Sequence, residues 1–91
     1  MGNLRRVVGW NLRRIRVRCG LSIEALAGNA EVDASHVARI ERGTTNSSVD
    51  VLGRLSDALG INPLELFRQQ SPETKPPKPL RSGRRPKIVP R

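Results

Sequence analysis

Residues 22–43 read SIEALAGNAEVDASHVARIERG, and this stretch decides the fold. Ser22 can cap a helix over residues 23–30, because its hydroxyl can accept a hydrogen bond from an unpaired N–H of the first turn. Asp33 can cap a second helix, which stops at Gly43 because glycine tolerates the left-handed conformation common just past helix ends. The stretch therefore predicts two short helices joined by a tight turn.

Helical periodicity extends on both sides of this hairpin. Upstream, apolar residues that fall within about 80° of one another predict a helix over about 3–19. Downstream, Ser47 or Ser48 can cap a fourth helix that ends near Leu59. The expected inward stripes are Leu4, Val8, Leu12, Ile15 and Cys19 in the first helix, and Val49, Leu52, Leu55 and Leu59 in the fourth.

A fifth, short helix is predicted to begin at residues 62–65, which read NPLE. Asparagine at the cap, proline at the first position and glutamate at the third position are each favoured at a helix start. No segment shows the sustained alternation of a half-buried strand. The predicted fold class is therefore all-α, with five helices.

The composition changes near residue 70, so we expect a domain over residues 1–69 and a separate tail over 70–91. The tail holds six of the seven prolines and seven basic residues against one acid, a composition that cannot assemble a packed core. We expect the tail to be disordered. It is interpreted either as a segment that follows the phosphate backbone or a minor groove of a nucleic acid, or as a solubilising linker, or as a docking site for a protein partner.

The chain of 91 residues carries 17 Lys and Arg against 8 Asp and Glu, a formal charge of +9. Such a charge favours polyanionic partners, with nucleic acid ahead of a membrane surface. No window approaches the roughly 20 apolar residues of a membrane-spanning segment. We therefore expect a cytoplasmic protein, associated with the nucleoid of a bacterium, and no membrane partner.

One cysteine and one histidine are too few for a zinc site, and no metal or other cofactor is expected. Cys19 continues the apolar stripe of the first helix, which predicts a small core residue. No glycine-rich phosphate loop and no nucleophile with a plausible base is found, so no enzymatic activity is expected. Trp10 falls away from that stripe and is predicted to lie on a contact surface or to pack against the tail or the fifth helix.

The helix over residues 34–42 is the candidate for contact with DNA, because the second helix of a helix-turn-helix lies in the major groove. Its outward side is small and basic, and an arginine can donate two hydrogen bonds to guanine. Arg39 is the first candidate for base reading. The alternative is an ordinary solvated helix face. The outward residues are Ser35, Ala38, Arg39 and Arg42.

Residues 8–67 resemble the lambda-repressor-like helix-turn-helix family, also called Cro/C1 or XRE. The resemblance rests on LRRIRVRCGLSIEALA (12–27), VDASHVARIERG (32–43) and NSSVDVLGRLSDALGINPLELF (46–67), with RIERG as its most specific signature. It implies a five-helix monomer that assembles as a homodimer on a palindromic operator in double-stranded DNA and controls transcription, most simply as a repressor or autoregulator.

The resemblance also implies roles for individual residues. Base contacts are expected from Ala34, Ser35, Ala38 and Arg39. Phosphate contacts are expected from Ile23, His36, Arg42, Thr44, Thr45 and Asn46. An ion pair between Arg16 and Glu41 is expected to brace the first helix against the third. Relatives commonly self-associate near the fifth helix, which here offers Ile61, Leu64, Leu66 and Phe67.

Three positions depart from the family pattern. Ile23 replaces a glutamine that hydrogen-bonds a phosphate, although backbone N–H groups at the same helix start can still do so. Glu31 replaces the glycine of the turn, which suggests a turn built differently, and Ser47 replaces a proline. The competing hypothesis in the same fold is an antitoxin that binds its operator with the domain and a partner protein with the tail.

Overall fold

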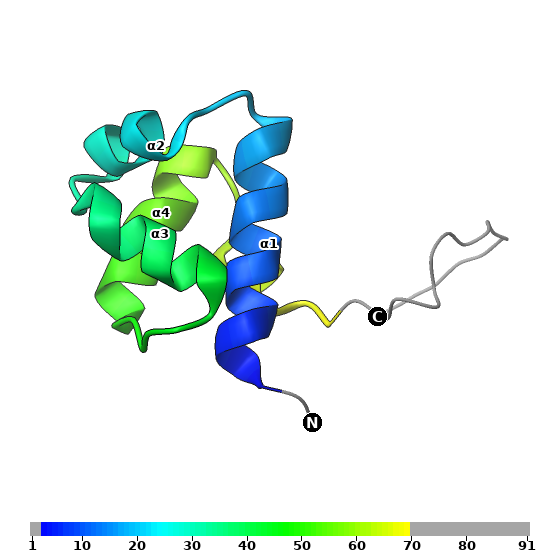
Figure 1. The fold of residues 1–91 in the computed structure, drawn as a ribbon. Coiled ribbons are helices and arrows are strands. Elements are labelled where there is room, and N and C mark those ends of the chain that lie inside the picture. The colour runs from blue at the N-terminus through cyan, green and yellow to red at the C-terminus, as the bar shows by residue number, and fades with distance from the viewer. Residues whose placement is uncertain (1–2, 70–91) are drawn as a thin grey trace, which may run out of the picture.

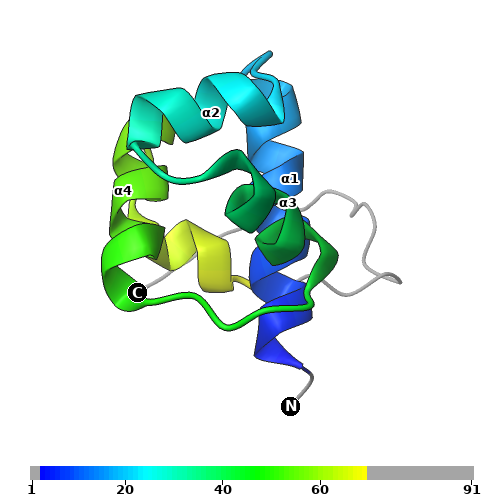
Figure 2. The same ribbon diagram turned by 60° about the vertical axis from the view of Figure 1, so that its left-hand side comes forward.

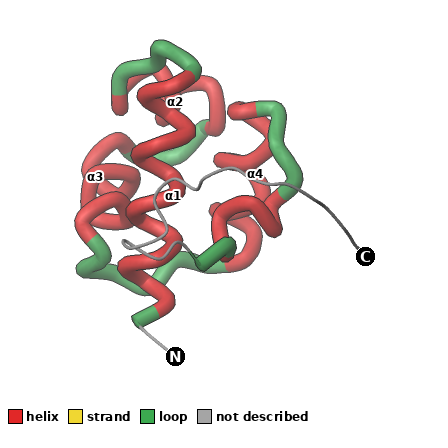
Figure 3. The backbone as a smooth tube through the Cα atoms, turned by 90° about the vertical axis from the view of Figure 1, so that its right-hand side faces the viewer, coloured by secondary structure: helices red, strands yellow, loops and turns green. Residues whose placement is uncertain are grey.

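The computed structural model describes residues 3–69 and contains four α-helices and one 3-10 helix (Figure 1). Figure 3 shows only helices and loops over this part of the chain, and no strand. The all-α prediction is therefore confirmed for these residues. None of the helices described has the length and apolar character that spanning a membrane requires. The helices are α1 (Leu4–Arg18), α2 (Ile23–Ala30), α3 (Ala34–Arg42), α4 (Val49–Leu59) and the 3-10 helix η1 (Pro63–Phe67).

The predicted fifth helix is thus a single 3-10 segment and not an α-helix. Its start is as the sequence indicates, because Asn62 accepts a hydrogen bond from the Leu64 N–H and Pro63 occupies the first helical position. The 3-10 form is common in short pieces, where few residues can form longer-range backbone bonds. The predicted tail over 70–91 lies outside the described residues.

Most of the helices begin at a side chain that accepts a hydrogen bond from the first turn. Ser48, and not Ser47, caps α4. Asp33 occupies the cap position of α3 with extended backbone, but its carboxylate makes no capping hydrogen bond. The capping bonds run from Arg5 N to Asn3 Oδ1, from Ala25 N to Ser22 Oγ and from Val51 N to Ser48 Oγ.

One apolar core lies between the helices. α1 packs against α3 and η1, while α2 packs against α3 and α4, so that every element covers two others or more (Figure 2). The fully enclosed side chains come from all five elements: Leu12, Leu26, Val37, Leu55 and Leu66. Because each helix contributes to the same core, the position of α3 is fixed by the whole domain.

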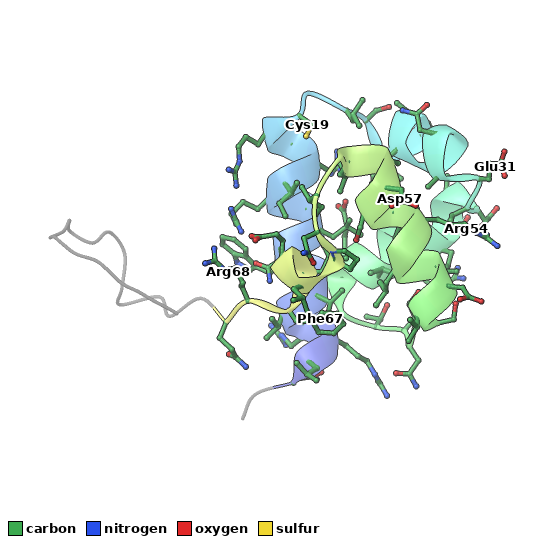
Figure 4. All side chains as sticks on the ribbon, turned by 180° about the vertical axis from the view of Figure 1, so that it is seen from behind. Cys19, Glu31, Arg54, Asp57, Phe67 and Arg68 are labelled. Carbon is green, nitrogen blue, oxygen red and sulfur yellow. The ribbon has the colours of Figure 1, made fainter. Side chains whose placement is uncertain are left out.

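Three residues assigned to the inward stripes lie at helix ends and are exposed. Cys19 is solvent-exposed, so the prediction of a core residue is wrong; α1 ends at Arg18, and Cys19 lies one residue beyond it (Figure 4). Leu4 and Val49 are the first residues of α1 and α4, and they are 44% and 84% exposed. Leu4 and Val49 are helical as the periodicity indicates, but the core does not extend to the helix ends.

Asn11 is a buried polar residue of α1 that the sequence pattern did not single out. Its amide nitrogen donates to the backbone carbonyls of Leu66, at 2.9 Å, and Arg68, at 2.8 Å. Its carbonyl oxygen Oδ1 accepts a bond from Arg14. A buried amide is stable only when its hydrogen bonds are satisfied, and here they fasten the end of η1 to α1.

Gly9 allows α1 to approach α3 closely. A Cβ atom at this position would lie 2.3 Å from the carbonyl oxygen of Ile40 and 2.7 Å from that of Glu41. Those are backbone atoms, which cannot move aside as a flexible side chain can. The distance between α1 and α3 therefore depends on glycine at this position.

Candidate nucleic-acid interface

α2 and α3 form the predicted hairpin, with a short turn between them (Figure 2). Glu31 occupies the turn with φ 58° and ψ 46°, the left-handed conformation that favours glycine. The expectation that a glutamate here builds a different kind of turn is therefore not met. The carbonyl of Glu31 accepts a hydrogen bond from Arg54 of α4.

α3 has one face anchored in the core and one face toward solvent. Val37 and Ile40 are 0% and 2% exposed and anchor the helix. On the outward side, Ser35 and Arg39 are exposed, and Ala38 is half-buried. Ala34 is also half-buried and packs against the core, so it offers less surface than the other three candidates for base reading.

The loop between α3 and α4 continues this outward surface. Gly43 ends α3 with φ 74°, and both the N–H and the hydroxyl of Thr44 donate to the carbonyl of Arg39. The hydroxyl of Thr45 donates to the carbonyl of Asn46, and Asn46 Oδ1 accepts from Arg5 Nε at 3.1 Å. The loop is therefore held by its own hydrogen bonds and by α1.

His36 faces the same loop. Its Nε2 lies 3.4 Å from the hydroxyl of Ser47, and the imidazole is half-buried. Ser47, where the family usually has proline, thus supplies a partner that proline cannot. One of the two ring nitrogens, Nε2, is thus in contact with a group of the protein in this structure.

Ile23 lies at the first position of α2, where its side chain is half-buried and packs against the core. An aliphatic side chain cannot hydrogen-bond a phosphate. The N–H of Ala25 donates to the Ser22 hydroxyl, so the two N–H groups before it in the first turn of α2 are the backbone groups left to donate to an anion at this place.

Arg16 and Glu41 form the pair that the resemblance implies. Arg16 Nε lies 2.6 Å from Glu41 Oε2, and Arg16 Nη2 lies 3.0 Å from Glu41 Oε1. Arg16 Nη1 also donates to the carbonyl of Leu21 at 2.8 Å. The hydrogen bond to Glu41 raises the pKa of Arg16, and the two side chains are only 12% and 6% exposed. This bidentate pair therefore fixes α3 to α1 and to the loop before α2.

The outward surface is cationic. Over residues 3–69, the ion pairs are Arg16 with Glu41 and Arg68 with Glu65, so Arg39, Arg42 and Arg5 have no acidic partner there. The same part of the chain contains no cluster of three metal-ligating side chains. The chemistry that this surface offers is hydrogen bonding and charge attraction toward an anion.

Comparison with known proteins identifies the family. The model of the helix-turn-helix domain matches residues 7–69. The control protein C.BamHI of Bacillus amyloliquefaciens is 37% identical over 66 residues, which cover 71% of this chain and 82% of that protein.

Solved structures give the same result. The restriction-modification controller protein C.AhdI from Aeromonas hydrophila has a TM-score of 0.68 and 41% identity, covering 69% of this chain and 96% of that one. The hypothetical transcription factor NHTF from Neisseria has a TM-score of 0.69 and 30% identity, covering 79% and 80%. These matches confirm the resemblance drawn from the residues: the chain belongs to the helix-turn-helix domain family.

Proposed function

We propose that this protein is a sequence-specific, double-stranded DNA-binding transcription regulator that inserts α3 into the major groove. The observation that carries the proposal is the two-sided character of α3. Its inward side is anchored by Val37 and Ile40, while its outward side presents small residues and Arg39. Small residues let the helix backbone approach the base edges, and arginine can read guanine through O6 and N7.

The surroundings of α3 supply the phosphate contacts of this proposal. Arg42, Thr44, Thr45 and Asn46 lie at the end of α3 and in the following loop, and the N–H groups at the start of α2 can donate to a second phosphate. We also assign a phosphate contact to His36, whose imidazole would give up its contact with the Ser47 hydroxyl in order to bind the phosphate.

The biological role in this proposal is control of transcription as a repressor or autoregulator. The relatives named above support it, because they are controller proteins and a transcription factor. The similarity to C.AhdI makes restriction-modification genes the first place to search for an operator. No contact among the described residues favours the antitoxin hypothesis over this one.

A homodimer on a palindromic operator completes the proposal. Leu66 of η1 is fully buried and belongs to the core, whereas Leu64 and Phe67 are 71% and 40% exposed. Phe67, Leu4 and Val49 line one shallow apolar pocket of about 190 Å³ beside η1. Exposed apolar side chains gathered at one place mark a contact surface. We assign the dimer contact to this apolar face, defined by Leu4, Val49 and Phe67, together with the exposed Leu64 of η1.

The experiment is selection of random duplex DNA by the purified full-length protein at physiological salt, followed by sequencing of the bound pool. A palindromic motif with half-sites about one helical turn apart is the expected result. Binding that shows no motif and vanishes as salt rises would contradict the proposal, because it would reflect charge alone.

Arg39→Ala tests the assignment of base reading. The variant should bind the selected site about 1–3 kcal/mol more weakly and lose preference at one base pair of each half-site. Arg18→Ala is the matched control, since it removes one exposed arginine from the end of α1, outside α3 and the following loop. Equal weakening on all sequences would make Arg39 a phosphate contact.

A further inference from the structure

An open pocket of about 650 Å³ lies on the outer side of α1, next to the C-terminal end of α3. It is separate from the small outward residues of α3 and from the apolar face beside η1. Its lining comes from five residues of α1 and from Arg42 and Glu41 of α3; the α1 residues are Arg6, Trp10, Arg13, Arg14 and Val17.

The floor of this pocket is apolar and exposed. Trp10 and Val17 are seven residues apart on α1, so they lie on one face of the helix, and each is 57% exposed. Arg14 lies between them in sequence, with its guanidinium carbon 5.4 Å from the centre of the Trp10 ring. An exposed tryptophan beside a second exposed apolar side chain is typical of a contact surface.

The rim of the pocket is strongly positive. Both carboxylate oxygens of Glu41 are bonded to Arg16, so Glu41 does not neutralise the other arginines. Arg6, Arg13 and Arg42 form no ion pair within residues 3–69. Arg14 Nε is buried and has no hydrogen-bond partner in that part of the chain. The pocket therefore combines an apolar floor with several guanidinium groups that can bind an anion.

We propose that this pocket binds an acidic peptide segment of a partner protein. A large apolar side chain of the segment packs on Trp10 and Val17, and flanking carboxylates accept hydrogen bonds from Arg6, Arg13 and Arg42. The proposal goes beyond DNA binding. Arg42 is shared with the proposed phosphate contacts, whereas Arg6, Arg13, Trp10 and Val17 have no part in them.

Charge and shape select this occupant over the other candidates. Duplex DNA offers phosphates, but it has no protruding apolar group that would cover Trp10 and Val17. The chain's own residues 71–91 carry seven basic residues against one acid and would be repelled by the arginines. A carboxylate-rich segment with one bulky apolar residue matches both the floor and the rim.

Trp10 is the only tryptophan in the chain, so its fluorescence reports directly on the pocket. The test titrates the full-length protein with a set of eight-residue peptides free of tryptophan and tyrosine. Each peptide has a central Phe, Leu, Ile or Met flanked by Asp and Glu. Matched peptides carry Asn and Gln in place of the acids. We expect a saturable change in Trp10 emission with the acidic set and binding at least about tenfold weaker with the amide set.

Variants then locate the contact. Arg6→Ala combined with Arg13→Ala should weaken acidic-peptide binding about fivefold to tenfold. Arg18→Ala should leave it unchanged, because Arg18 is an exposed arginine of the same helix that does not line the pocket. Far-ultraviolet circular dichroism checks that each variant is folded.

Each of the following results would overturn the proposal. No acidic peptide binds, or the acidic and amide sets bind equally well. Arg18→Ala weakens acidic-peptide binding as much as the double variant does. Trp10→Ala changes the protein from dimer to monomer. The last would assign the pocket to a second copy of this chain. Quenching of Trp10 by duplex DNA that acidic peptides do not displace would assign it to nucleic acid instead.

Discussion

Two polar side chains of α1 hold separate parts of the domain in place. Arg16 binds Glu41 of α3 and the carbonyl of Leu21, and Asn11 binds two carbonyls at the end of η1. Because the Glu41 bond raises the pKa of Arg16, the stability from this bond is fully present below the ordinary arginine pKa and is lost only at still higher pH. DNA-binding measurements over the usual pH range therefore leave Arg16 charged.

Glu31 is the one residue other than glycine with positive φ in residues 3–69, and its replacement gives a clear prediction. Glu31→Gly should raise the free energy of unfolding by about 0.5–1 kcal/mol, because the strain of a left-handed residue exceeds the extra chain entropy of glycine. Urea denaturation followed by circular dichroism measures the change.

Glu31→Gln is the control for charge in that measurement. It keeps the side chain and the backbone strain but removes the carboxylate. If Glu31→Gln stabilises the protein as much as Glu31→Gly does, the gain is electrostatic and the strain argument is wrong.

At the scale of elements, the close approach of α1 and α3 rests on Gly9. Gly9→Ala should lower the free energy of unfolding by about 1–3 kcal/mol, because the added methyl group meets two backbone carbonyls and the helices must move apart. The same variant should weaken specific DNA binding, since α3 shifts relative to the rest of the interface. Thermal denaturation and titration of the selected operator measure the two effects.

Gly53→Ala is the matched control, because Gly53 lies inside α4 and a Cβ there would meet no atom within 4 Å. Alanine is the better helix former, so this variant should gain about 0.5–1 kcal/mol. If the two variants change stability in the same direction, the close contact at Gly9 does not determine the helix spacing.

The sequence was sufficient for the four α-helices and for the exposed face of α3, because caps, glycine stops and periodicity are local signals. It failed where a residue's surroundings come from distant parts of the chain. Cys19 continues the predicted apolar stripe, but it follows the last residue of α1 and is exposed, outside the core. Asn11 lies on the apolar stripe of α1, and that polar interruption was the signal for a buried contact. Gly9 carried no local signal, since its importance comes only from the backbone of α3.

The roles of the interface residues were less predictable than the helices. The resemblance assigned phosphate contacts to Ile23 and His36, and these remain predictions. The structure packs the Ile23 side chain on the core, which leaves that contact to backbone N–H groups, and places His36 against Ser47. Both differences follow from residues that depart from the family pattern. A motif identifies the surface, whereas the hydrogen bonds of each chain decide which groups are available on it.

At the scale of the whole molecule, the apolar face beside η1 should govern self-association. Phe67→Asp should shift the protein from dimer to monomer in sedimentation velocity, because a charge would be buried in the contact. The monomer should also bind the palindromic operator more weakly, since two half-sites are no longer engaged by one particle. Trp10→Ala is measured as the comparison. If Phe67→Asp sediments like the unchanged protein, the dimer contact lies elsewhere.

The distribution of charge gives the second prediction at this scale. Seven basic residues and one acid lie in residues 71–91, so about two thirds of the net charge of +9 is carried there. If this segment follows the DNA backbone, its removal should reduce the slope of log affinity against log salt by about 0.9 for each phosphate that it neutralises. The selected motif should stay the same, because phosphate contacts carry no sequence information. A changed motif would show that the segment reads bases, and an unchanged slope would show that its positive charge acts away from the DNA.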